Sequence, residues 1–142
     1  MSIFGMQITN ILRGISEDLE RKRIYLPINE MIASGYMIDD LLNRRLNKEF
    51  IDVWKRLANR AESHYEKAFS AMDLYPLDAR LPVKSSAVLY RAILKSIRKK
   101  GYNVFEQRAF VTDKDKKSFY QLSQEANNSL KRAISIIWNS PF

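Results

Sequence analysis

The stretch QITNILRGISEDLERKRIYLP, residues 7–27, repeats apolar side chains at the spacing of an α-helix. The repeated positions, three or four residues apart, are Ile8, Ile11, Leu12, Ile15 and Leu19. Positions at this spacing share one face of a helix, so the stretch predicts an amphipathic helix over residues 3–20. Pro27 favours an extended backbone before it, and we therefore expect the helix to end ahead of this proline.

Long helical runs continue through the rest of the chain. The same spacing predicts helices over about residues 47–73, 79–100 and 115–138, joined by shorter helical pieces. Glycine and proline number only four each among 142 residues, so few positions interrupt these runs. The predicted fold class is all-α, and residues 1–142 form a single domain large enough to bury a core.

Composition limits the compartment and the kinds of site. The chain has no cysteine, which excludes disulfides and thiolate metal ligands and fits a reducing compartment. No run of about 18 apolar residues occurs, and the N-terminal residues lack the pattern of a signal peptide. We therefore expect a cytoplasmic protein that is in solution or peripheral to a membrane.

The positive charge is concentrated in the second half of the chain. The net charge is +8; residues 1–71 carry 11 basic and 10 acidic side chains, and residues 72–142 carry 13 and 6. This excess suits an anionic membrane surface, a diphosphate group, nucleic acid or simply a solvated surface. No zinc-finger spacing, RNA-binding aromatic motif or glycine-rich phosphate loop occurs, so we expect no nucleic-acid partner.

Polar residues gather on one face of the predicted first helix. Asn10, Gly14 and Asp18 fall four residues apart, and Gln7 and Arg13 lie at the edge of the same face. Amide and carboxylate oxygens stacked in this way can hold Mg²⁺, which prefers few protein carboxylates together with phosphate oxygens. From the residues alone the signal is weak, because a lone aspartate on an amphipathic helix is more often simply solvated.

Longer motifs carry a resemblance to a known family. NILRxxxED, followed by RxRIYLP, resembles the second aspartate-rich region of phytoene and dehydrosqualene synthases, and DARLPVKSSAVLYRAIL (residues 78–94) and GYNVFEQRAFV (residues 101–111) extend it. The resemblance covers about residues 2–120 and implies the C-terminal part of an all-α isoprenoid-synthase fold. In that fold two aspartate-rich helices face each other across a deep apolar cavity and supply Mg²⁺ ligands.

The resemblance also implies a reaction and roles for individual residues. The family condenses two prenyl diphosphates, farnesyl or geranylgeranyl, head to head in isoprenoid and carotenoid biosynthesis. By position, the metal-site residues are Asn10 and Asp18, the residues near the diphosphate are Arg13 and Arg23, the cavity-lining residues are Tyr25 and Tyr90, and Gln7 orients a metal-bound water. Arg13, Arg23 and Tyr25 are the candidate catalytic residues, while Gln7, Asn10 and Tyr90 join the two arginines in binding substrate.

Two departures from the family pattern bear on activity. The second motif of the family is DxxxD, and its first aspartate is replaced here by Gly14, so we expect a weakened or lost Mg²⁺ site. The first DxxxD motif occurs nowhere in this chain and would lie before Met1. We therefore expect a partial domain, a truncated synthase that is inactive alone, although whether Met1 is the native start stays open.

Three functions remain open from the sequence. The chain is one part of a prenyltransferase whose other half comes from another chain; or it is a non-catalytic interaction protein or remnant of the same fold; or it is a basic helical nucleic-acid binder. Tyr102, Phe105 and Phe110 face a prenyl chain under the first hypothesis and belong to the core otherwise.

Overall fold

The computed structural model describes residues 3–106, and within them all regular structure is helical. The elements, in chain order, are α1 (Ile3–Arg13), α2 (Ile15–Glu20), α3 (Ile28–Ser34), α4 (Ile38–Leu42), α5 (Lys48–Ser70), the 3₁₀ turn η1 (Met72–Leu74) and α6 (Leu77–Lys99). The all-α prediction is confirmed for this part of the chain. The helix predicted over 115–138 lies outside the described residues.

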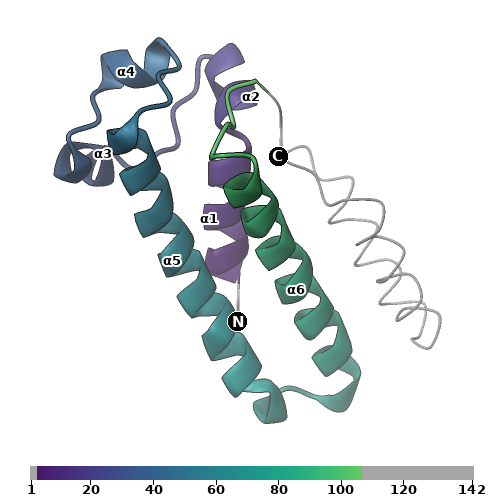
Figure 1. Cartoon of the computed structure of the whole chain (residues 1–142). Helices are drawn as coiled ribbons and strands as arrows, with labels where there is room; N and C mark the ends of the chain where they lie inside the picture. The colour runs from purple at the N-terminus through teal and green to yellow at the C-terminus, as the bar shows by residue number, and fades with distance from the viewer. Residues whose placement is uncertain (1–2, 107–142) are drawn as a thin grey trace.

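Three long helices form the body of the molecule. α5 and α6 run antiparallel as a hairpin, and α1 packs against both of them (Figure 1). α3 packs on α5, and together with α4 it occupies one end of the hairpin (Figure 1). This arrangement places α1, which carries Asn10 and continues into α2 with Asp18, against the side of α6 that faces the core.

The ends of the helices follow from local chemistry. Asn47 caps α5, because its side-chain oxygen accepts a hydrogen bond of 2.9 Å from the Phe50 backbone amide. Gly35 ends α3 in the left-handed region, at φ 75°, where glycine carries no steric penalty. α6 begins directly after Pro76, two residues earlier than the predicted boundary at position 79.

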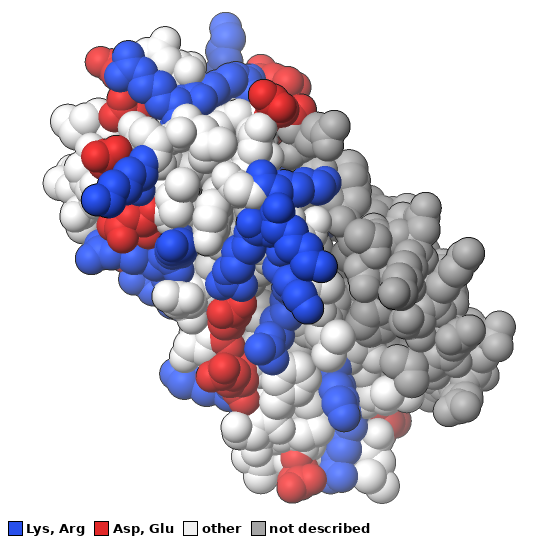
Figure 2. Space-filling model, in the orientation of Figure 1, with Lys and Arg blue, Asp and Glu red and all other residues white. Residues whose placement is uncertain are grey.

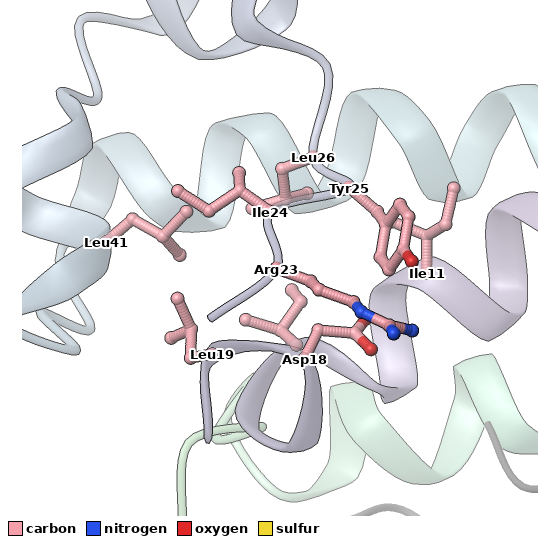
Figure 3. Close-up of a pocket in the computed structure, with 9 residues that line it drawn as sticks. Ile11, Asp18, Leu19, Arg23, Ile24, Tyr25, Leu26 and Leu41 are labelled. Carbon is pink, nitrogen blue, oxygen red and sulfur yellow. The ribbon is translucent and has the colours of Figure 1, made fainter. Parts of the chain in front are cut away.

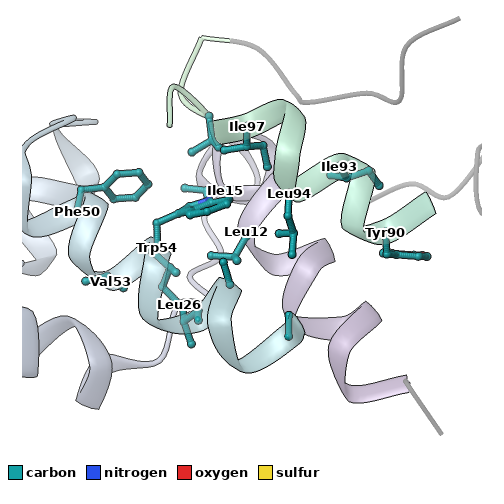
Figure 4. Packing of buried hydrophobic residues seen from close by; sticks show 14 of the residues in the cluster. Leu12, Ile15, Leu26, Phe50, Val53, Trp54, Tyr90, Ile93, Leu94 and Ile97 are labelled. Atoms are coloured by element: carbon teal, nitrogen blue, oxygen red, sulfur yellow. The ribbon is translucent and has the colours of Figure 1, made fainter. Parts of the chain in front are cut away.

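A continuous apolar core joins the three long helices. Side chains from α1, α2, α5 and α6 meet around Trp54, which is fully buried (Figure 4). The core residues labelled there are Leu12, Ile15, Leu26, Phe50, Val53, Trp54, Tyr90, Ile93, Leu94 and Ile97. Across residues 3–106, no helix is both long enough and apolar enough to cross a membrane.

Aromatic residues after α6 also belong to this core. The Tyr102 ring meets Trp54 edge-on at 5.1 Å, and the Phe105 ring lies 4.8 Å from that of Phe50. Both residues therefore pack against the core of the described part of the chain. Phe110, the third aromatic residue considered with them, lies outside the described residues.

Candidate functional site

The helix predicted over residues 3–20 bends at Gly14 and is divided there into α1 and α2. Gly14 has φ −95° and ψ 7°, outside the helical range. Its amide nevertheless donates to the Asn10 carbonyl oxygen at 3.0 Å, and the Asp18 amide donates to the Gly14 carbonyl oxygen at 2.9 Å. The hydrogen-bond ladder thus continues through the bend, and it keeps Asn10, Gly14 and Asp18 stacked along one face.

This face lines a cavity of about 500 Å³. The cavity draws residues from α1, α2, the link between α2 and α3, and α6: Met6, Gln7, Asn10, Ile11, Asp18, Tyr25 and Tyr90. Five of the seven residues predicted from the sequence therefore line one cavity. The sequence did not predict Met6 and Ile11 as cavity residues, although Met6 lies four residues from Asn10 and Ile11 four from Gln7, so the helical period could have found them.

The two predicted arginines are not among the residues that line this cavity, but each lies beside residues that do. Arg13 is only 4% exposed, and its guanidinium carbon lies 5.9 Å from the centre of the Tyr90 ring. Arg23 lines a small adjoining pocket together with Asp18 and Tyr25, and its side chain extends toward the same side as the Asp18 carboxylate (Figure 3). The Arg23 backbone amide also donates to the Asp18 carbonyl oxygen at 2.7 Å, which fixes the turn after α2.

Among the side chains of the cavity, Asn10 and Asp18 offer oxygen atoms to a cation. Asp18 is 6% exposed, and the Asn10 side-chain oxygen is buried with no hydrogen-bond partner within residues 3–106. These residues contain no group of three Asp, Glu, His or Cys side chains that could hold a metal ion. One carboxylate and one amide oxygen fit Mg²⁺ that takes its remaining ligands from water and from phosphate oxygens of a substrate.

A buried hydrogen bond fixes α1 against α5. The Thr9 hydroxyl donates to the Gly5 carbonyl oxygen at 2.8 Å, so the Tyr65 hydroxyl, 2.7 Å away, donates to Thr9. Burial raises the pKa of Tyr65 well above its ordinary value, which keeps this donor protonated. Gly5 allows the close approach, because a Cβ there would lie 3.0 Å from the Ala61 carbonyl oxygen. Together these contacts set where α1 presents Gln7 and Asn10.

A second network holds α2, the helix of Asp18. The Ser16 hydroxyl donates to the Phe105 carbonyl oxygen at 3.0 Å. Arg44 donates to the Ser16 hydroxyl oxygen at 2.7 Å and to the same carbonyl at 3.3 Å. Three segments far apart in the sequence therefore meet at α2, and sequence patterns carry no signal for such a contact.

Comparisons with known proteins find relatives over most of the chain. The family model described as squalene/phytoene synthase matches residues 4–115. The chain is 40% identical over 105 residues to a 15-cis-phytoene synthase from Synechocystis sp. This match covers 74% of the chain and 31% of that protein. It is 37% identical over 110 residues to the chloroplastic phytoene synthase 1 of Solanum lycopersicum, covering 78% and 27%.

Solved structures give the same result. A crystal structure of a dehydrosqualene synthase in complex with ligand has a TM-score of 0.70 and 32% identity, covering 90% of this chain and 44% of that one. YisP from Bacillus subtilis has a TM-score of 0.72 and 29% identity, covering 82% and 47%. These matches confirm the resemblance found in the sequence motifs. The chain spans about a third or less of the length of the two phytoene synthases from Synechocystis and Solanum lycopersicum.

Proposed function

This chain belongs to the squalene/phytoene synthase family, and we propose that it forms part of the active site of a head-to-head prenyltransferase. The proposed substrates are prenyl diphosphates, farnesyl or geranylgeranyl. One observation carries the proposal: a single cavity combines the polar residues Gln7, Asn10 and Asp18 with apolar and aromatic side chains. Such a cavity suits a molecule with an anionic head and a long hydrocarbon tail.

The polar part of the cavity would receive the diphosphate. Asn10 and Asp18 would hold Mg²⁺, which when bound supplies positive charge to the departing diphosphate oxygens. Arg13, beside Tyr90, and Arg23, beside Asp18, would add positive charge, and guanidinium groups pair well with phosphate oxygens. Gln7 would orient a water molecule of the ion. These residues together stabilise the charge that develops on the leaving group.

The apolar part of the cavity would receive the prenyl chain. Met6, Ile11, Tyr25 and Tyr90 line it, and hydrocarbon against such side chains excludes water. Aromatic faces also attract positive charge, so the two tyrosines suit a site where an allylic cation forms after the diphosphate leaves. The matches cover about a third or less of the two phytoene synthases compared, and we propose that further protein, from another segment or a second chain, supplies the facing wall.

A non-catalytic protein of the same fold is the second candidate. Gly14 favours it, because this position stands between Asn10 and Asp18 and offers no side-chain oxygen to a metal ion. A protein of this kind would keep the helical fold and lose Mg²⁺-dependent binding of a diphosphate. The two candidates therefore differ in a measurable property.

The deciding experiment is calorimetric titration of the purified chain with a prenyl diphosphate, with Mg²⁺ and with EDTA in its place. We expect Mg²⁺-dependent binding, and no binding of the corresponding prenyl alcohol, because the charged head is then missing. Product analysis for a condensed hydrocarbon and for released pyrophosphate accompanies the titration. A folded chain that binds neither substrate nor pyrophosphate with Mg²⁺ would contradict a metal site formed by this chain alone and would favour the non-catalytic function.

A further inference from the structure

One face of α6 forms a long exposed stripe on the outside of the molecule. Its members recur three or four residues apart, and all are exposed: Leu77, Leu81, Lys84, Val88, Arg91, Lys95 and Lys99. At 100° per residue they fall within roughly 80° of the helix circumference, and 22 steps of 1.5 Å give a length of about 33 Å. We call this set the α6 stripe.

The charged members of the α6 stripe are all cations. Asp78 is the single acidic residue of α6 and is not a member of the stripe. Of the nearby acidic residues, Glu62 on α5 accepts from Arg98 at 2.6 Å, and Asp73 lies 3.9 Å from the Arg80 guanidinium. Lys and Arg side chains gather over α6 on the face seen in Figure 2. The stripe is therefore a strongly positive surface.

Apolar side chains extend the same surface toward the start of α6. Leu77 is 79% exposed, and Leu74, in the turn before it, is 86% exposed. The turn is fixed, because Arg80 donates to the Tyr75 and Asp73 carbonyl oxygens at 3.0 and 2.9 Å. Leucines held in water at a fixed turn are unfavourable in an isolated protein and typical of a surface that contacts something apolar.

We propose that the α6 stripe and Leu74 dock on the surface of an anionic lipid bilayer. A helix with cations and leucines on one outer face lies well in the interface, where cations meet lipid headgroups and leucines enter the acyl boundary. Nucleic acid would use the cations and leave the leucines in water, so the combination favours a bilayer. The proposal does not depend on the proposed enzymatic function, since the cavity residue of α6, Tyr90, lies on its buried side.

The test measures co-flotation of the full chain with vesicles. One set contains phosphatidylcholine alone, and the other also contains phosphatidylglycerol. We expect binding to the anionic vesicles to be at least about tenfold stronger and to weaken at high salt, because several cations near an anionic surface contribute together. Equal affinity for the two vesicle types, or none for either, overturns the proposal.

Matched charge reversals locate the surface. Lys84→Glu/Lys95→Glu changes two exposed lysines of the stripe, and Lys22→Glu/Lys48→Glu makes the same change in net charge at two exposed lysines elsewhere. We expect the first pair to lower vesicle affinity at least about tenfold and the second to leave most of it. Equal losses in the two double variants would mean that only net charge matters and would overturn the assignment to α6.

A leucine variant separates a bilayer from other polyanions. Leu74→Ser/Leu77→Ser should lower vesicle binding severalfold while leaving the weak binding of any basic protein to double-stranded DNA unchanged. Both side chains are mostly exposed, so the fold should be retained, as circular dichroism can check. Vesicle binding that is unaffected by this change, together with tight DNA binding, would show a nucleic-acid surface instead.

Discussion

Asn10, Gly14 and Asp18 form a row on the cavity wall, and the middle position carries no side chain. The backbone hydrogen bonds through Gly14 keep the first and third positions aligned, so the row still offers an amide oxygen and a carboxylate. The surroundings of the two oxygen donors differ. The side-chain oxygen of Asn10 has no hydrogen-bond partner among the described residues, whereas Asp18 lines a small pocket together with Arg23. The capacity for Mg²⁺ therefore depends on very few atoms.

Replacing Asp18 should remove that capacity. In Asp18→Ala the cavity loses the one carboxylate among its lining residues in the described part of the chain, and we expect Mg²⁺-dependent binding of pyrophosphate to fall at least about tenfold, equivalent to ~1.4 kcal/mol. Glu20→Ala is the matched control, because Glu20 lies on the same short helix and is exposed. Calorimetric titration checks both variants, and an Asp18→Ala affinity equal to that of the unaltered chain would remove Asp18 from the metal site.

Restoring a carboxylate at position 14 should have the opposite effect. The φ of −95° at Gly14 is open to any L-residue, so Gly14→Asp can place a third oxygen donor between Asn10 and Asp18. We expect tighter Mg²⁺-dependent pyrophosphate binding in Gly14→Asp and no gain in Gly14→Ala, which removes the glycine without adding a ligand. If the aspartate variant binds no better, then the row lacks the geometry of a metal site.

At the scale of elements, the position of α1 on α5 decides where the cavity residues lie. Thr9 and Tyr65 form the buried polar contact between these helices, and the close approach at Gly5 fixes their separation. Because Gln7 and Asn10 lie within two residues of Thr9 on the same helix, the same contact orients the cavity wall. The interface between α1 and α5 thus couples packing to the site.

Substitutions of this pair should be strongly non-additive. In Thr9→Val the Tyr65 hydroxyl stays buried without its acceptor, and we expect a loss of about 1–3 kcal/mol in the free energy of unfolding. The double variant Thr9→Val/Tyr65→Phe removes both polar groups and should be more stable than Thr9→Val alone. Urea denaturation of the single and double variants measures the coupling, and simple addition of the two single losses would contradict the hydrogen bond.

The elements differ in how far the sequence predicts them. The long helices could be predicted because their apolar faces repeat over many turns, as with Phe50, Trp54 and Leu57. The bend at Gly14 could not, since one glycine does not say whether a helix continues. The stacking of Arg13 on Tyr90 and the contact of Ser16 with Phe105 join residues far apart in the chain, and only the tertiary structure brings them together.

At the scale of the whole molecule, Trp54 joins the parts that frame the cavity. It extends from α5, meets Tyr102 after α6 edge-on and lies 5.4 Å beneath the Arg98 guanidinium of α6. Arg98 is also paired with Glu62, so the same region carries an ion pair between the two long helices. The hairpin of α5 and α6, and with it the cavity residue Tyr90, depends on this packing.

Two substitutions of Trp54 should separate volume from polarity. Trp54→Ala leaves a large cavity in the core, and we expect a loss of about 3–5 kcal/mol in the free energy of unfolding. Trp54→Phe keeps an aromatic ring for Tyr102 and loses no hydrogen bond, because the indole nitrogen is buried without a partner in residues 3–106, so it should cost clearly less. Urea denaturation followed by circular dichroism measures both variants. Equal losses in the two variants would contradict this expectation, because they would mean that the phenyl ring of Trp54→Phe restores none of the packing that the indole provides.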